Sequence, residues 1–230
     1  MKTLSIVIPA YNEERYIATL LERITAVDLT PLGVRPEIIV VDDCSRDKTA
    51  EIVASIPGVT LHRMPKNGGK GQAVRAGIGL ATGDYLIIQD ADLEYDPRDY
   101  VPMLVRLFEG DAQIVYGSRY LGRGRYPNQS LAAYVGGRSL SLITVALTGQ
   151  YLTDTVTALK LFERRDIAGL ALETSGFELD HEITARMVAR GRRIAEVPIR
   201  YYPRTRAEGK KIGARDWFIA AKTLWRYRRG

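Results

Sequence analysis

The stretch LIIQDADLEYDP, residues 86–97, carries the signal that decides the fold. Its three leading apolar residues are typical of a buried strand, and they run directly into four carboxylates, those of Asp90, Asp92, Glu94 and Asp96. Like charges at this spacing repel one another, and burying them without a partner is costly. The sequence therefore predicts a positive group beyond the end of this strand, for which a divalent metal ion is the natural candidate.

Strand and helix patterns alternate on both sides of this stretch. Runs typical of strands cover residues 4–10, 37–43, 58–64, 84–92 and 112–120, and helical segments separate them. The alternation predicts an α/β fold with a mostly parallel sheet and helices on both faces. Ligands bind such sheets beyond the carboxyl ends of the strands. The polar residues expected at those ends are Tyr11, Asp42, Asp43, Asp90 and Asp92.

The chain after residue 120 has a different pattern. We expect a helix over residues 131–148, a short strand near 157–162, a helix near 178–190 and a strand within 193–203. A basic loop then leads to a closing basic helix with an apolar stripe of Trp217, Ala221, Leu224 and Trp225. Such a helix suits either an anionic membrane surface or packing on the domain.

Charge is unevenly spread over the 230 residues. The net charge is +6, of which residues 1–118 contribute −5 and residues 119–230 contribute +11. A basic second half indicates an anionic partner such as a phosphate, a nucleic acid or an acidic membrane, or else a solvated basic face. The single cysteine excludes an internal disulfide.

Neither a signal peptide nor a membrane span is expected. The first apolar run is short and soon meets charged residues, and no stretch reaches the roughly 18 apolar residues of a span. The nearest candidate contains Arg138 in its middle. We therefore expect a chain that is soluble or lies on a membrane without crossing it.

Several segments resemble a known family in type, order and spacing. They are SIVIPAYNEERYI, VVDDCSRDKT, KNGGKGQAVRAGIGLATGDYLIIQDADLEYDP, GSRY, FELDHEITARMVARGRRIAEVPI and YYPRTRAEGKKI. The chain resembles family 2 glycosyltransferases with a GT-A fold, of the dolichyl- or polyprenyl-phosphate sugar synthase type. The resemblance implies a single domain over residues 1–212, with a nucleotide-sugar-binding half (1–118) and an acceptor-binding half (119–212), followed by the basic helix of residues 213–230.

The resemblance implies a donor site at the strand ends. The residues that it places on the nucleotide-diphosphate sugar are Pro9, Ala10, Tyr11, Glu13, Asp42, Asp43, Lys70, Asp90, Ala91 and Asp92. It also implies Mg²⁺ or Mn²⁺, held by Asp90, Asp92 and Glu94, since carboxylate oxygens suit these ions. The family often has glutamine where Glu94 stands.

The glycine loop and two helix starts carry further expectations. Gly68, Gly69 and Gly71 would let backbone approach the donor, and the spacing of a phosphate-binding P-loop is absent. Asn12 and Asp96 are expected to cap the helices that follow them.

The resemblance implies an acceptor site in the basic half. Arg119, Arg138, Arg204 and Lys211 are expected on the acceptor phosphate, because arginine donates two parallel hydrogen bonds to such groups. Asp92, Asp154, Arg119 and Arg204 are the expected catalytic residues. Near Asp154, Thr157 and Lys160 match the family, whereas Ala158 and Leu159 depart from it and leave the sugar open. His181 is a candidate metal ligand or acceptor contact, or a structural histidine.

The implied reaction is an inverting transfer of a hexose to a polyprenyl phosphate at the cytoplasmic face of a membrane. The alternative acceptor is a hydroxyl, which requires a base, with Asp154 first and Asp180 second. A sugar-nucleotide nucleotidyltransferase would need a glycine-rich basic loop where AYNEERYI stands. A nucleic-acid-binding module explains neither the acidic strand ends nor the lack of an aromatic platform.

Overall fold

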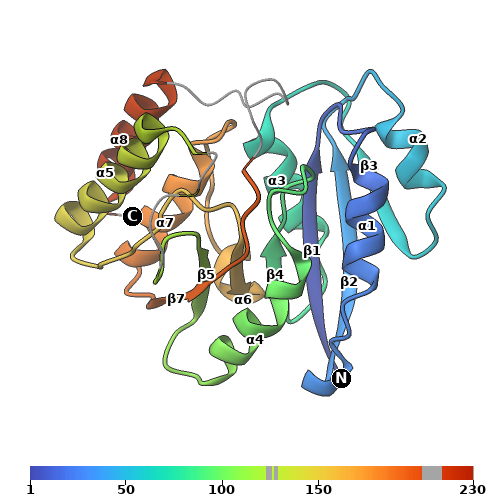
Figure 1. The fold of residues 1–230 in the computed structure, drawn as a ribbon, viewed down its shortest axis with the longest axis horizontal. Helices are drawn as coiled ribbons and strands as arrows, with labels where there is room; N and C mark the ends of the chain where they lie inside the picture. The colour runs from blue at the N-terminus through green and yellow to red at the C-terminus, as the bar shows by residue number, and fades with distance from the viewer. Residues whose placement is uncertain (123–125, 127–128, 204–213, 230) are drawn as a thin grey trace.

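A seven-stranded sheet forms the centre of the molecule, with its strands in the order β3-β2-β1-β4-β6-β5-β7 (Figure 1). The structure is a computed structural model that describes residues 1–122, 126, 129–203 and 214–229. The strands are β1 (Lys2–Ala10), β2 (Val34–Asp42), β3 (Val59–Arg63), β4 (Tyr85–Ile88), β5 (Ile114–Ser118), β6 (Lys160–Glu163) and β7 (Ile194–Pro198). The α/β fold predicted from the alternation is confirmed.

Helices connect these strands and cover the sheet. They are α1 (Ile17–Thr25), α2 (Thr49–Ala54), α3 (Lys70–Leu80), α4 (Tyr100–Phe108), α5 (Leu131–Thr148), α6 (Arg164–Ala168), α7 (Leu179–Ala189) and α8 (Ala214–Tyr227). Two short 3₁₀ turns, Thr30–Leu32 and Pro97–Asp99, complete the described elements. The helix predicted over residues 131–148 has the bounds of α5.

The sheet is mostly parallel, as predicted, with one exception. Strands β3, β2, β1 and β4 run in the same direction, and β5 is parallel to β7. Strand β6 lies between β4 and β5 and is antiparallel to both. The start of β6 therefore lies at the same end of the sheet as the carboxyl ends of β4 and β5.

Two apolar layers cover the two faces of the sheet. Leu20, Leu21 and Ile24 of α1 pack with α4 residues on one face. Residues of α3, α6 and α7 fill the other face, where Ile183 is fully buried. Helices α5 and α8 form a further layer outside α7, through Leu140, Ala185 and Leu224. Leucines and isoleucines at helical spacing thus fix both layers.

Helix α5 is unusual because little of it is buried. Among the described residues it is the one helix long and apolar enough to span a membrane, by length and composition alone, with a mean hydropathy of 1.3. As expected, Arg138 interrupts its apolar residues, but it is the only charge among the 18, so the mean hydropathy remains high enough for this test. Leu131, Val135 and Leu142 are exposed on α5.

The two predicted helix caps have different outcomes. Asp96 accepts a hydrogen bond from the Arg98 backbone N–H and caps the turn that leads into α4, as predicted. The prediction for Asn12 was wrong, since α1 begins later, at Ile17. Asn12 has a left-handed backbone (φ 56°), and its Oδ1 atom accepts from the Arg46 backbone N–H. It therefore joins the two loops that follow β1 and β2.

Candidate active site

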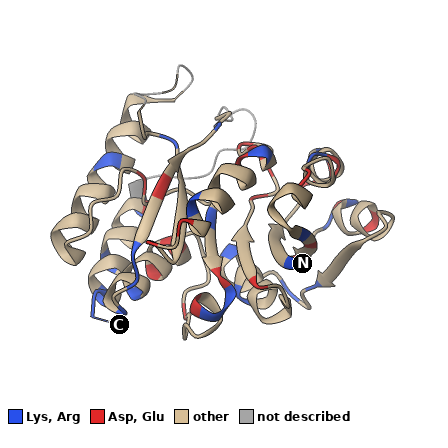
Figure 2. Ribbon diagram, turned by 90° about the horizontal axis from the view of Figure 1, so that it is seen from below, with Lys and Arg blue, Asp and Glu red and all other residues tan. Residues whose placement is uncertain are grey.

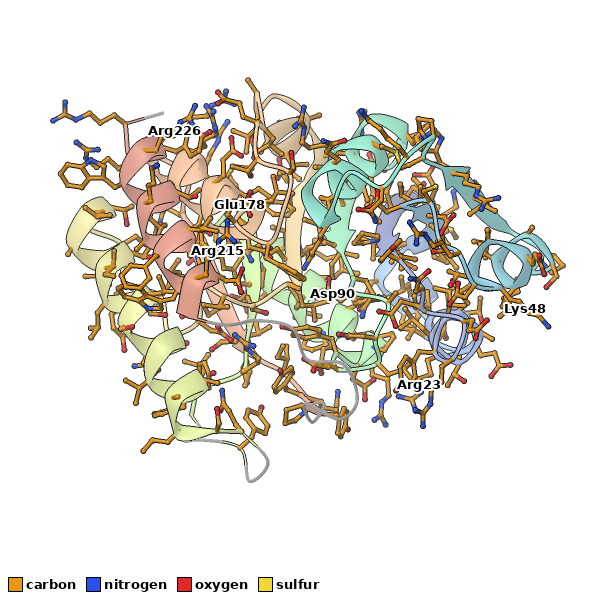
Figure 3. All side chains as sticks on the ribbon, turned by 90° about the horizontal axis from the view of Figure 1, so that it is seen from above. Arg23, Lys48, Asp90, Glu178, Arg215 and Arg226 are labelled. Atoms are coloured by element: carbon orange, nitrogen blue, oxygen red, sulfur yellow. The ribbon has the colours of Figure 1, made fainter. Side chains whose placement is uncertain are left out.

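A cavity of about 1230 Å³ opens at the carboxyl ends of β1, β2 and β4. Ala10 pairs with Asp42 at the ends of the first two strands, and the Gln89 backbone N–H donates to the Val7 carbonyl just after β4. This register brings Asp90 to the mouth of the sheet. Figure 3 shows Asp90 near the middle of the molecule, between the α7–α8 side and the α1–α2 side. The convergence expected from the sequence is therefore present.

Most of the predicted donor residues line this cavity. They are Pro9, Ala10, Tyr11, Glu13, Asp43, Lys70, Asp90, Ala91 and Asp92. Asp42 does not line it. Its fully buried carboxylate accepts from the Ser45 backbone N–H at 3.2 Å and pairs with Arg63 Nε at 3.3 Å. Asp42 thus shapes the turn after β2.

Asp43 holds the glycine loop. Its two carboxylate oxygens accept from the backbone N–H groups of Gly68 and Gly69, both at 2.8 Å. Gly69 has φ +88°, and a Cβ atom there would lie 2.6 Å from the Ser175 carbonyl oxygen. The Gly71 N–H donates to that same oxygen. These glycines therefore allow the loop to pack on residues 174–176, a contact that the sequence did not predict.

Two lysines and two aspartates alternate in a chain of ion pairs, of which Lys70, Asp90 and Asp180 line the cavity. Lys70 Nζ lies 2.7 Å from Asp90 Oδ1 and 3.5 Å from Asp180 Oδ2, and Lys160 Nζ lies 2.9 Å from Asp180 Oδ1. Burial opposes the charge on Lys70, but Asp180 and Asp90 outweigh it and raise its pKa. Burial lowers the pKa of Lys160, which is fully enclosed, although Asp180 acts against this. The site thus already attracts cations to the acidic strand end.

The acidic stretch presents oxygen ligands of the kind that Mg²⁺ and Mn²⁺ prefer. Asp90, Asp92 and Glu94 all line the cavity, and the buried Glu94 also accepts a hydrogen bond from the Tyr201 hydroxyl at 2.6 Å, which leaves Asp90 and Asp92 as the more open carboxylates. Within the described ranges no three acidic, histidine or cysteine side chains are grouped to hold a metal by themselves. Two carboxylates that need further oxygens from a diphosphate fit a divalent ion that arrives with a nucleotide.

Arg119 and Asp154 form a buried ion pair. Arg119 Nε and Nη2 donate to Asp154 at 2.6 and 2.8 Å, and the Arg119 backbone N–H adds a third bond at 3.0 Å. Burial opposes the Arg119 charge, but Asp154 outweighs it and raises the pKa. Arg119 lines the cavity, and Asp154 lies behind it, fully buried. Asp154 thus orients the guanidinium.

Aromatic rings frame the same guanidinium. It lies 5.1 Å from the centre of the Tyr201 ring and 5.4 Å from that of Tyr120. No sequence pattern indicated these tyrosines, apart from the place of Tyr120 within GSRY and of Tyr201 just before the basic loop. Cation–π contacts of this kind hold an arginine in place while it remains charged.

Of the other predicted phosphate contacts, the structure describes Arg138 alone. Arg138 Nη1 donates to the Thr153 carbonyl at 2.6 Å, and Arg138 is not part of the cavity lining. Arg204 and Lys211 lie outside the described residues. Arg119 is therefore the one predicted acceptor contact that the described part of the chain brings to the cavity.

The cavity has a second, apolar end between α5 and α8. Most of its lining there is apolar, from Ala132, Ala133, Gly136, Gly137, Leu140, Trp217, Phe218, Ile219 and Ala220, and Asp216 of α8 adds a carboxylate. No role was expected for the two adjacent glycines, although glycine inside a helix costs about 1 kcal/mol relative to alanine. Trp217 is half-buried and donates from Nε1 to Ser139, so its ring closes this end. The residues of the predicted apolar stripe of α8 therefore do not share one environment: Trp217 lines the cavity, whereas Trp225 is exposed to solvent.

Several curated relatives of the chain are named as sugar transferases. It is 30% identical over 230 residues to the dolichol-phosphate mannosyltransferase of Pyrococcus furiosus. The aligned region covers 98% of this chain and 61% of that protein. It is 32% identical to the undecaprenyl-phosphate 4-deoxy-4-formamido-L-arabinose transferase of Photorhabdus laumondii, over 74% of this chain and 52% of that one. The chain thus spans little more than half the length of these relatives.

Solved structures and a family model agree on the fold. The glucosyl-3-phosphoglycerate synthase of Mycobacterium tuberculosis bound to UDP superposes with a TM-score of 0.73 at 22% identity, covering 99% of this chain and 80% of that one. Other structures of that enzyme contain Mn²⁺ or Mg²⁺ with UDP. Residues 5–165 match the family model described as glycosyl transferase family 2. The chain has a GT-A fold and belongs to glycosyl transferase family 2.

Proposed function

We propose that the protein transfers a hexose from a nucleotide-diphosphate sugar to a polyprenyl phosphate. The observation that carries this proposal is the shape of the cavity, which joins the acidic strand ends, Arg119 and the apolar space between α5 and α8. Its volume of about 1230 Å³ exceeds the roughly 300–1,000 Å³ of an ordinary small-molecule site. A phosphate at Arg119 with a hydrocarbon tail between α5 and α8 would use both ends.

The donor half supplies the nucleotide contacts in this proposal. Tyr11 and Asp43 follow β1 and β2 directly and line the cavity, which supports assigning them to the base and ribose. Asp90 and Asp92 would hold the divalent ion together with the donor diphosphate. When bound, the ion would neutralise charge on the departing nucleotide. The structures of the M. tuberculosis synthase that contain Mn²⁺ or Mg²⁺ with UDP support this assignment.

Arg119 has the central role at the acceptor. Two of its donor groups bind Asp154, and the described residues give its Nη1 atom no partner. That edge of the guanidinium could bind a phosphate oxygen of the lipid. A lipid phosphate is already anionic, so its attack on the anomeric carbon needs no strong base. The buried, fully engaged Asp154 is poorly placed to accept a proton from a hydroxyl.

We further propose that α5 and α8 rest on a membrane surface. Phe218 and Trp225 of α8 are 69% and 57% exposed, and with Lys222 and Arg229 they follow one helical face. Lysine and arginine gather at the end of α8 near the C-terminus (Figure 2). Arg228 stacks on the Trp225 ring at 3.5 Å. Aromatic and basic side chains on one face suit an anionic interface.

Replacing both Phe218 and Trp225 by serine should reduce binding to phosphatidylglycerol vesicles about tenfold or more, since each buried aromatic ring contributes roughly 1.5–3 kcal/mol. Co-sedimentation measures the bound fraction. Phe108→Ser is the matched control, because Phe108 is an exposed aromatic residue of α4, outside the α5–α8 layer. Equal binding of the double variant and wild type would contradict a membrane role for this face.

The acceptor class is tested with a matrix of donors and acceptors. UDP- and GDP-hexoses are supplied with Mn²⁺, and the acceptor is undecaprenyl phosphate, dolichyl phosphate or 3-phosphoglycerate. The lipid reading predicts a lipid-linked sugar. Transfer only to 3-phosphoglycerate, the acceptor type named for the M. tuberculosis neighbour, would replace the polyprenyl acceptor by a hydroxyl acceptor.

Gly136→Leu should block the apolar end of the cavity selectively. A Cβ atom at Gly136 would lie 3.7 Å from the Trp217 ring, an ordinary contact, while a longer side chain would fill the space between the two helices. We expect the KM for undecaprenyl phosphate to rise about tenfold with little change in nucleotide-sugar binding. Gly79→Leu is the matched control, because it makes the same glycine-to-leucine change in a helix at an exposed position of α3, away from the cavity. An unchanged KM would place the lipid elsewhere.

A further inference from the structure

His181 is a buried histidine of the cavity wall to which the proposed reaction assigns no role. It lies in the first turn of α7, directly after Asp180, and lines the same cavity as Lys70 and Asp90. The residue is 4% exposed. Its Nδ1 atom is buried, and the described part of the chain provides it with no hydrogen-bond partner.

Packing alone does not account for this side chain. A buried polar atom without a partner costs about 1–3 kcal/mol, and leucine would fill the position without that cost. Neighbouring polar residues of α7 are satisfied: Asp180 binds two lysines, Glu182 accepts from Thr174, and Thr184 donates to the Asp180 carbonyl. His181 therefore stands apart within its own helix, at a position that faces the cavity.

The charge state of His181 indicates which chemical group of a ligand it would bind. Burial lowers its pKa to about 4, although Asp180 acts in the opposite direction. The imidazole is therefore uncharged at neutral pH, with one N–H donor and one nitrogen acceptor. A hydroxyl group both donates and accepts, so it matches a neutral imidazole. Phosphate oxygens only accept, and the cations Lys70 and Arg119 already serve them in the same cavity.

The position of His181 in the cavity indicates which part of the donor it would contact. Asp180 beside it is joined through Lys70 to Asp90, which lies where the donor diphosphate is proposed to bind. In a nucleotide-diphosphate sugar, the diphosphate joins the ribose to the hexose ring, and both carry hydroxyls. Because Tyr11 and Asp43 are proposed to hold the base and ribose, the hexose is the group left for the α7 side of the cavity. We propose that His181 hydrogen-bonds a hydroxyl of the transferred hexose and so determines part of the sugar specificity. This inference rests on the proposed function, because it requires a nucleotide-sugar donor.

Calorimetric binding isolates this role from catalysis and from the acceptor. UDP, UDP-glucose, GDP, GDP-mannose and the monodeoxy analogues of the preferred donor are titrated into wild type, His181→Leu, His181→Gln and the control His62→Leu. We expect His181→Leu to bind the nucleoside diphosphate within about twofold of wild type but the nucleotide sugar about tenfold more weakly. One deoxy analogue should bind wild type and His181→Leu equally. His181→Gln, which keeps a donor and an acceptor, should recover part of the affinity.

Two outcomes overturn the inference. One is equal affinity of wild type and His181→Leu for every nucleotide sugar, and the other is an equal loss for the nucleoside diphosphate. If His181→Leu does not fold, wild type with the deoxy analogues decides, and equal binding of every analogue and the parent sugar overturns the inference. Because these titrations contain no acceptor, they test the role of His181 even if the protein does not transfer sugar to polyprenyl phosphate.

Discussion

Asp92→Ala should lose transfer activity by about 10³-fold, together with metal-dependent nucleotide binding, while the fold is retained. Asp92 lines the cavity beyond β4, and its carboxylate is one of two that would hold the divalent ion with the donor diphosphate. Removing charge stabilisation at a developing anion typically costs 10²–10³-fold in turnover. Titrating Mn²⁺ and the nucleoside diphosphate into the variant separates loss of the metal site from general damage.

Asp96→Ala is the matched control for this experiment. Asp96 belongs to the same acidic stretch, but its carboxylate caps the turn before α4 and binds Arg98. Its replacement should cost about 1 kcal/mol of stability, as for other helix caps, and leave metal binding unchanged. Turnover of Asp92→Ala at the wild-type rate, or undiminished wild-type turnover in excess EDTA, would remove the metal from the proposed function.

Asp154→Asn should lower the free energy of unfolding by about 3–5 kcal/mol and abolish transfer. The substitution leaves the buried Arg119 guanidinium without its counter-charge, and breaking a buried pair carries a penalty of this size. Urea denaturation measures the loss. Asp111→Asn, which breaks the exposed pair of Asp111 with Arg106, should leave the free energy of unfolding nearly unchanged, because solvent screens exposed ion pairs.

A double variant distinguishes an orienting Asp154 from a catalytic base. Arg119→Met combined with Asp154→Leu removes both charges, so much of the lost stability should return while transfer stays absent. A base role instead predicts that Asp154→Asn loses turnover at wild-type stability. That result, combined with transfer to a hydroxyl acceptor, would reverse the assignment of Asp154 made here.

The elements and the acidic strand ends could be predicted because their signals are local. Apolar runs mark the strands, and Asp90 and Asp92 directly follow one of them. The antiparallel direction of β6 could not be predicted, since four residues carry no signal for direction. The role of the glycine loop was equally hidden, because Gly71 contacts Ser175, more than a hundred residues away along the chain.

The site was predicted better at its donor end than at its acceptor end. Donor residues follow strands whose register is fixed by the sheet, so their order in sequence gives their arrangement in space. The acceptor end depends on the packing of α5 against α8, and neither helix indicates its partner through its own pattern. The ion pair of Arg119 and Asp154 joins two separate segments in the same way, and each residue was predicted without its partner.

The position of β6 has a consequence for how the protein could be divided. Strand β4 has no contact in the sheet with β5; the strand that joins them comes from the chain after residue 159. A fragment of residues 1–118 would therefore leave β4 with an open edge and β5 without either of its partners. The donor and acceptor halves should unfold in one cooperative transition and should not be exchangeable as modules between related enzymes. New acceptor specificity would then have to arise by substitution around a shared sheet, with no transplant of an intact half.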